Sequence, residues 1–307
     1  MSRRPISGRS SGRVVAATGN DLDKGSFSHS SRDDSLGVAV ANGGRVSAAR
    51  SAAVQRSLTD LDRQIVRSLA TVRLASGRQL QRLYFGDGEA AARRAGRCLK
   101  RLTDLRVLGR LERRTGGVRA GSTGFVYVLD VIGQAMDGLP GRRPWQLGNA
   151  FVTHGLLVTE CYVLTTEAAA AGAFSVGGFM TEPDCWLSFT GPGGLTVLKP
   201  DALAVIESGE FIDRWWLEVD NATESPSRIA AKAALYAQAY RLAATGRQPF
   251  PKVLWVCTDA ERERRLIRTL RALPEPDRDL MAVCRIDGLT AVVAAGPDAC
   301  SLDGRLP

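Results

Sequence analysis

Two apolar runs that are bordered by acidic residues most constrain the fold of this chain. The first run, ALAVI, begins directly after Asp201, and the second, WWLEV, contains Glu218 and leads into Asp220. Such runs predict two β-strands, which the short SGE segment between them joins into a hairpin. A hairpin brings the start of one strand beside the end of the other, so we expect Asp201 to lie near Glu218. Glu218 and Asp220 are two residues apart, so they point to one face of their strand.

A helix is predicted directly after this hairpin, over SPSRIAAKAALYAQAYRLAATG. Ser225 suits the cap position, Pro226 the first helical position and Gly246 the end. Lys232 shares one face of this helix with Tyr236. Two interpretations of Lys232 stay open: it acts in an active site, or it is a surface lysine or an ion-pair partner of Glu218.

The acidic residues at the strand ends indicate a metal-dependent site. Magnesium takes oxygen ligands, commonly one or two carboxylates with water and substrate phosphate. The sequence therefore offers Asp201 and Glu218 as ligands of Mg²⁺ or Mn²⁺, with Asp220 assisting and Lys232 stabilising charge on a phosphate. Structural roles are also open, since Asp201 suits a loop cap, and Glu218 and Asp220 suit pairing with arginines.

Residues 149–295 predict an α/β domain with the element order α-β-β-β-α-β-α-β. A long helix begins this domain and carries Glu160. The predicted strands cover FSVGGFMTEPDCWLSF, LTVLKPDALAVIE, DRWWLEVD, KVLWVCTD and LMAVCRI, and AERERRLIRTLRAL predicts the last helix.

Residues 57–138 predict three helices followed by a hairpin, which is the layout of a winged helix-turn-helix. The third helix and the hairpin are rich in basic residues, and in such a domain the third helix enters the major groove of DNA. The alternative is a solvated charged helix face. The candidate DNA-binding residues are Arg93, Arg94, Arg97, Lys100, Arg101, Arg113 and Arg114.

The remaining segments predict little packed structure. Residues 1–56 are rich in Ser, Gly and Arg and predict a disordered basic tail. Residues 139–148 contain two prolines and predict a linker, and residues 296–307 predict a C-terminal tail.

The composition favours a polyanionic partner. The chain has 41 Lys and Arg against 32 Asp and Glu, a net charge of +9, which makes nucleic acid the leading candidate. No apolar run is long enough to span a membrane, and no signal peptide is evident, so we expect a cytoplasmic protein. The six cysteines form no CxxC pair, so neither a zinc finger nor a disulfide framework is expected.

Short motifs resemble two nested groups of proteins. "PD" followed by "E-x-D", with a helix before and after, resembles the PD-(D/E)xK nuclease fold, with its αβββαβ core. With the winged helix added, "PDA … LEVDNATES … K-x3-Y" resembles the replication-relaxation family of actinobacterial plasmid and mobile-element proteins. The resemblance implies that Asp201 and Glu218 are metal ligands and that Glu160 contributes a further acid. Asp220 stands at the position of the motif's lysine, which Lys232 on the next helix would replace.

Three functions stay open from the sequence, the third being a winged-helix regulator whose second domain senses a small ligand. The first is a double-stranded-DNA-binding protein of plasmid replication or relaxation whose nuclease-like domain nicks or cuts DNA with Mg²⁺ or Mn²⁺. The second is a non-catalytic replication or transcription factor whose nuclease fold is degenerate, with no cofactor, and serves in a homodimer or in contacts with replication or conjugation proteins.

Overall fold

The computed structural model describes residues 13–15, 46–111, 125–138, 147–191, 193–243 and 250–302. The chain divides into two compact units, residues 17–163 and residues 1–16 with 164–307. The division falls inside the helix α6 (Asn149–Ala170) rather than in the linker expected at 139–148, most of which lies outside the described residues. Each unit is described by itself.

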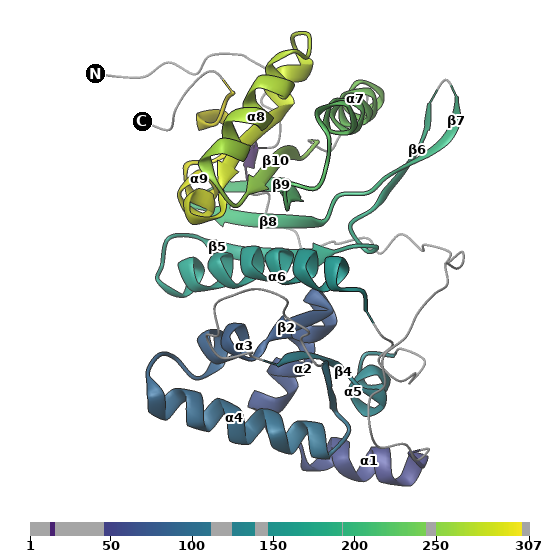
Figure 1. Cartoon of the computed structure of the whole chain (residues 1–307), viewed down its shortest axis with the longest axis vertical. Helices are drawn as coiled ribbons and strands as arrows, with labels where there is room; N and C mark the ends of the chain where they lie inside the picture. Colours follow the sequence, from purple (N-terminus) through teal and green to yellow (C-terminus); the bar gives the residue numbers. More distant parts are fainter. Residues whose placement is uncertain are drawn as a thin grey trace. The chain divides into compact units, whose positions relative to one another are not determined.

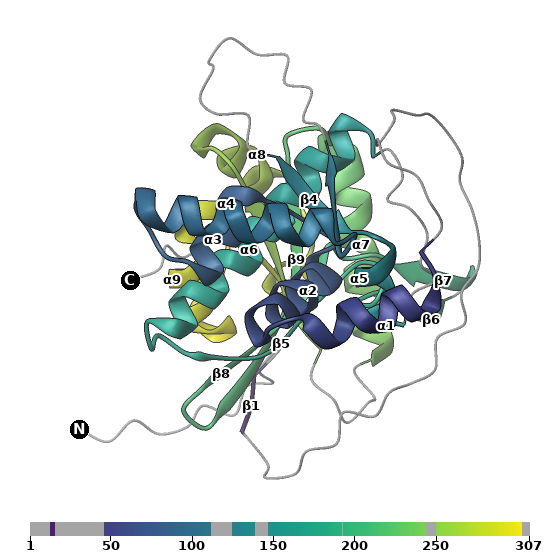
Figure 2. The same cartoon turned by 90° about the horizontal axis from the view of Figure 1, so that it is seen from below.

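Helices predominate in the N-terminal unit. They are α1 (Ala48–Ser57), α2 (Asp60–Val72), α3 (Gly77–Tyr84), α4 (Glu89–Asp104) and α5 (Val131–Met136). Thr59 and Ser76 cap α2 and α3 with capping boxes. The hydroxyl of the cap residue accepts the amide of the third helical residue, Asp62 or Gln79, whose side chain accepts the backbone amide of the cap residue. Figure 2 shows α3 and α4 side by side. The three helices predicted from 59 to 105 are confirmed.

A small antiparallel sheet completes this unit. The strands β2 (Leu74–Ser76), β4 (Val126–Leu129) and β3 (Leu108–Leu111) pair in that order. The predicted hairpin corresponds to β3 and β4, while β2 was not predicted because it is short and directly precedes α3. The loop between β3 and β4, which carries Arg113 and Arg114, lies outside the described residues.

Two apolar clusters hold the N-terminal unit together. In the main one, Ile65, Leu80 and Leu102 from the three central helices are fully buried and pack together with Leu108 of β3. In the second, Phe151, Val152 and Leu156 at the start of α6 pack against Leu74, Val126 and Val128 of the sheet. The first turns of α6 therefore belong to the N-terminal core.

The C-terminal unit is built on a mixed sheet with strand order β11-β10-β9-β8-β5. Figure 1 labels β10, β9, β8 and β5 of this sheet. The strands are β5 (Ser175–Thr181), β8 (Ala202–Ser208), β9 (Phe211–Asp220), β10 (Lys252–Cys257) and β11 (Met281–Arg285). The β5–β8 and β8–β9 pairs are antiparallel, whereas β9–β10 and β10–β11 are parallel. The predicted hairpin around Asp201 and Glu218 is therefore confirmed as β8 and β9.

Helices α7 (Pro226–Ala243) and α8 (Ala260–Arg271) lie on the same side of this sheet in Figure 1. Trp216 of β9 packs in one core with Tyr236 of α7 and Leu266 and Leu270 of α8. The remaining helix, α9 (Leu289–Ala295), follows β11 and was not predicted.

Two predicted strands are each divided in the structure. The segment from 174 forms β5, a turn and β6 (Leu187–Gly191), and the segment from 195 forms β7 (Gly194–Leu198), a break and β8. Pro183 lies in the first turn and Pro200 in the second break, and proline has no amide for a strand ladder. β6 and β7 pair with each other as a separate hairpin that projects from the sheet in Figure 1.

The predicted tails also differ from the structure. Within residues 1–56, residues 48–56 lie in α1, and Arg13–Val15 form β1, which pairs with the start of β9. At the other end, Cys300 and Leu302 are buried, and the Lys252 side chain donates to the carbonyl oxygens of Pro297 and Cys300. Isolated apolar residues in a polar stretch give too weak a periodic signal to predict such packing.

Candidate functional site

Asp201 lies directly before β8 and forms hydrogen bonds with the residues on either side of Glu218. Its amide donates to the carbonyl oxygen of Leu217 at 3.1 Å, and its Oδ2 atom accepts the amide of Val219 at 2.7 Å. The two contacts flank Glu218 in the chain, so the aspartate of the PD motif stands beside the glutamate as the hairpin predicts.

Both carboxylate oxygens of Glu218 are held by side chains of α7. Lys232 forms an ion pair with Oε2, and the Tyr236 hydroxyl donates to Oε1. Lys232 and Tyr236 are four residues apart, so both reach the sheet from one helix face. The Glu218 side chain is 2% exposed and that of Lys232 27% exposed. Solvent therefore reaches the lysine of this pair but hardly reaches the glutamate.

Burial dominates the electrostatics of this cluster. It raises the pKa of Glu218 to about 8, against the opposing effect of the Lys232 ammonium group, and the Asp201 charge adds to the rise. Burial also disfavours the charged form of Lys232, but the carboxylates of Glu218 and Asp201 outweigh it and raise the lysine's pKa. A proton is therefore held on Glu218 at pH values where a free glutamate has lost it.

Cys185 and Tyr236 extend the cluster beyond the residues with predicted roles. The Cys185 thiol donates to the carbonyl oxygen of Pro200 at 3.1 Å, and burial raises the pKa of this thiol strongly. Burial also raises the pKa of Tyr236 well above its ordinary value. Both groups are therefore neutral donors. The four-residue spacing of Lys232 and Tyr236 indicated that the tyrosine lies on the same helix face, but no sequence pattern indicates that Cys185 lies in this cluster.

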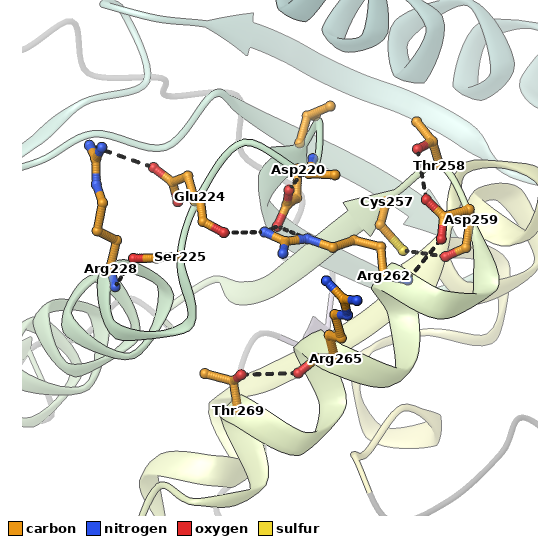
Figure 3. Close-up of polar contacts among 12 residues, drawn as sticks. Asp220, Glu224, Ser225, Arg228, Cys257, Thr258, Asp259, Arg262, Arg265 and Thr269 are labelled. Carbon is orange, nitrogen blue, oxygen red and sulfur yellow. Dashed lines mark hydrogen bonds and ion pairs between the residues drawn. The ribbon is translucent and has the colours of Figure 1, made fainter.

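Asp220 belongs to a separate network at the end of β9 (Figure 3). Its Oδ2 accepts Nε and Nη2 of Arg262 at 3.0 and 2.6 Å, and its Oδ1 accepts the amide of Ala222 at 2.6 Å. Arg262 also donates to the carbonyl oxygen of Glu224 at 2.7 Å. Asp220 and Arg262 are both buried. The acid at the motif's lysine position thus holds the β9–α7 loop to the first turn of α8.

Glu160 makes its contacts within the N-terminal unit. It forms an ion pair with Arg82 and accepts Nε2 of Gln79 at 2.9 Å, both on α3. The Glu160 side chain therefore anchors α3 to α6.

A divalent cation can bind between Asp201 and Glu218 only if their carboxylate oxygens are free to coordinate it. Asp201 and Glu218 have the right ligand chemistry. However, both Glu218 oxygens already accept side-chain donors, and one Asp201 oxygen accepts a backbone amide. Over the described ranges, no group of three or more His, Cys, Asp and Glu side chains is arranged to hold a metal ion. As arranged, Glu218 offers no oxygen free of a donor, so a Mg²⁺ or Mn²⁺ ion bound to it would have to displace Lys232 or Tyr236.

The basic residues of α4 fall into two groups. In the first, each has an acidic partner: Arg93 pairs with Glu89 at 2.8 Å and Lys100 with Asp104 at 2.7 Å, both on the exposed surface. Arg101 instead contacts Asp62 of α2 at 2.6 Å, and Asp62 is fully buried. Arg101 therefore fixes α4 on α2.

The second group is free of acidic partners within the described residues. Arg94 is exposed and donates only to the carbonyl oxygen of Phe85, at 3.0 Å. Arg97 is exposed and forms neither a hydrogen bond nor an ion pair with any described residue. These two arginines carry uncompensated positive charge on the outer face of α4.

The two units differ in net charge, since the unit of residues 1–16 and 164–307 carries 19 Lys and Arg against 19 Asp and Glu, a net charge of zero. Residues 17–163 carry 22 Lys and Arg against 13 Asp and Glu, a net charge of +9. Residues 164–307 carry 15 Lys and Arg against 19 Asp and Glu, a net charge of −4. The positive excess of the chain thus lies outside the segment that contains Asp201 and Glu218. Among the helices described, none is both long and apolar enough to cross a membrane.

A sequence model of the replication-relaxation family matches residues 66–253. The chain belongs to the replication-relaxation family. The match runs from α2 to the start of β10, so it includes α4, Asp201, Glu218 and Lys232. Neither a curated protein nor a solved structure matched the chain.

Proposed function

We propose that this replication-relaxation protein binds double-stranded DNA through its N-terminal unit, as a winged helix-turn-helix. In this interpretation α3 and α4 form the helix-turn-helix, and β2, β4 and β3 form the sheet that carries the wing. The second helix of such a motif lies in the major groove, where its outer side chains contact bases and phosphates. α4 would take this position.

The division of charge carries the proposal. DNA binding depends on cations that neutralise phosphates, and the positive excess lies in the unit that contains α4. Within α4, Arg94 and Arg97 have no acidic partner among the described residues, so they are the first candidates to contact DNA. Arg101 would act indirectly, since it holds α4 in place through Asp62.

We further propose that the C-terminal unit has a PD-(D/E)xK-like fold whose acidic cluster stabilises the unit rather than cleaving DNA. Burial favours the protonated form of Glu218, and Lys232 and Tyr236 occupy its oxygens. A net charge of −4 on residues 164–307 also opposes the approach of a phosphodiester. Both features favour the non-catalytic alternative.

The family suggests the biological setting. Membership in the replication-relaxation family is consistent with a role in replication or relaxation of plasmid or other mobile-element DNA. A DNA-binding protein in that setting would bring its C-terminal unit to a bound site, where a second copy or another replication or conjugation protein could be the partner.

One gel experiment tests both parts of the proposal. Supercoiled and linear plasmid are incubated with the full chain in Mg²⁺ or Mn²⁺, and half of each sample is deproteinised before electrophoresis. We expect retarded bands in the untreated half, and in the deproteinised half a topoisomer pattern identical to that of the Asp201→Ala/Glu218→Ala variant. Absence of retardation would contradict DNA binding. Nicked or linear product that only the unaltered chain generates would instead establish a metal-dependent nuclease.

A further inference from the structure

The outer face of α8 carries positive charge that the fold does not use. The helix packs on the core through Leu266 and Leu270, and Arg262 reaches inward to Asp220. Arg264 and Arg268 point to solvent on the opposite side, and neither has a hydrogen-bond or ion-pair partner anywhere in the described part of the chain. Both are therefore exposed cations on a rigidly anchored helix.

The acids of α8 are committed to other arginines. Glu261 forms an ion pair with Arg265, and the Oε2 atom of Glu263 lies 4.0 Å from the Nε atom of Arg285 on β11. Neither acid is thus paired with Arg264 or Arg268. The positive charge of these two residues is consequently not balanced within the helix.

Helix stability does not explain this arrangement. Arg268 lies in the last turn, where a cation favours the helix dipole, but Arg264 lies in the first half, where it does not. Arg264 and Arg268 are four residues apart, about 6 Å along the axis. Like charges at this spacing destabilise a helix. An anionic partner would remove this repulsion.

We propose that the outer face of α8, with Arg264 and Arg268 as its main contacts, binds the phosphate backbone of DNA. This inference rests on the proposed DNA-binding function and adds a second contact surface to it. DNA suits the surface because it presents phosphates at regular spacing, and α8 offers two arginines on one face. Since residues 164–307 carry a net charge of −4, α8 would be the side of this segment that approaches DNA.

The test compares two double variants of the full chain in DNA binding at several salt concentrations. Arg264→Gln/Arg268→Gln removes the two unpaired charges. Arg228→Gln/Arg278→Gln removes two charges from the same unit that already face Glu224 and Glu275. Each lost phosphate contact lowers the slope of log affinity against log salt by about 0.9. We expect the α8 variant to lower the slope by nearly two, and the control to change it little.

The outcomes separate this inference from the proposed function. If the α8 variant and the control bind DNA alike while α4 variants lose affinity, DNA binding stands and α8 is no contact. Folding does not confound the result, because removing a like-charge pair should leave the melting temperature unchanged or slightly higher. An α8 variant that loses affinity only together with a lower melting temperature would contradict the proposal.

Discussion

The Lys232 ammonium group forms an ion pair with the Glu218 carboxylate, which is almost completely withdrawn from solvent. Tyr236 holds the other carboxylate oxygen from the next turn of α7. This contact joins the central strand of the sheet to the helix that covers it. In a nuclease the same residue types would face a metal and a phosphate, so their engagement with one another decides how the C-terminal unit is interpreted.

Glu218 should make stability depend on pH. Its pKa rises from 4.5 to about 8 in the folded state, so between these values the folded chain binds a proton that the unfolded chain has released. The free energy of unfolding therefore falls as pH rises through this window, by at most about 1.4 kcal/mol per pH unit from this group. Denaturant unfolding from pH 5 to 8 should show that Glu218→Gln, which mimics the protonated acid, lacks this component. An identical pH slope in both proteins would show that Glu218 is ionised throughout.

Lys232→Met should be more harmful at high pH than at low pH. At pH 6 the variant loses chiefly one hydrogen bond, since Glu218 is protonated. At pH 9 the unaltered chain holds an ionised Glu218 beside its cation, whereas in the variant the pKa of Glu218 rises further and the acid must keep its proton. The loss of unfolding free energy should therefore be about 1 kcal/mol larger at pH 9 than at pH 6. The readout is the difference in unfolding free energy between the two pH values. A difference of zero would contradict the ion pair.

Arg262 and Asp220 should behave as a coupled pair. Arg262→Ala leaves Asp220 buried and charged, so we expect a loss of about 3–5 kcal/mol in unfolding free energy. The double variant Asp220→Asn/Arg262→Ala should recover part of this loss, because no buried charge remains. Thermal or urea unfolding of these proteins and of the single variant Asp220→Asn completes the four-member cycle. Strictly additive losses would mean that the two side chains do not interact.

Arg101 and Arg97 should have separable effects although both lie on α4. Arg101→Gln leaves the buried Asp62 without its cation and should lower the unfolding free energy by about 1–3 kcal/mol. Arg97→Gln removes an exposed side chain and should change stability by less than about 0.5 kcal/mol. Melting curves of the two variants check this. Equal destabilisation by both substitutions would contradict the assignment of Arg101 as the residue that positions α4.

Local pattern was sufficient to predict the central hairpin and its carboxylates. The apolar runs predicted β8 and β9, and the turn between them placed Asp201 beside Glu218. The spacing of α7 placed Lys232 toward the sheet, and an ion pair with Glu218 was one of two interpretations. These contacts follow from strand alternation, helix period and one short turn.

Contacts between distant parts of the chain could not be predicted in the same way. Arg262 lies 42 residues after Asp220, and no local pattern marks it as the buried arginine among its exposed neighbours on α8. Glu160 looked equally suited to a catalytic site, but its partners on α3 come from the preceding domain in the chain. Arg101 shares the charge pattern of Arg97, and only the position of Asp62 distinguishes them.

The most direct test of the account is the affinity of the full chain for a labelled DNA duplex, measured by fluorescence anisotropy at several salt concentrations. Arg94→Gln/Arg97→Gln is compared with Arg56→Gln/Arg67→Gln, which removes two exposed charges from α1 and α2 of the same unit. We predict that the α4 variant loses at least tenfold in affinity and nearly two in salt slope, while the α1–α2 variant binds almost as the unaltered chain does. Equal affinity and slope in both variants would contradict DNA binding through α4.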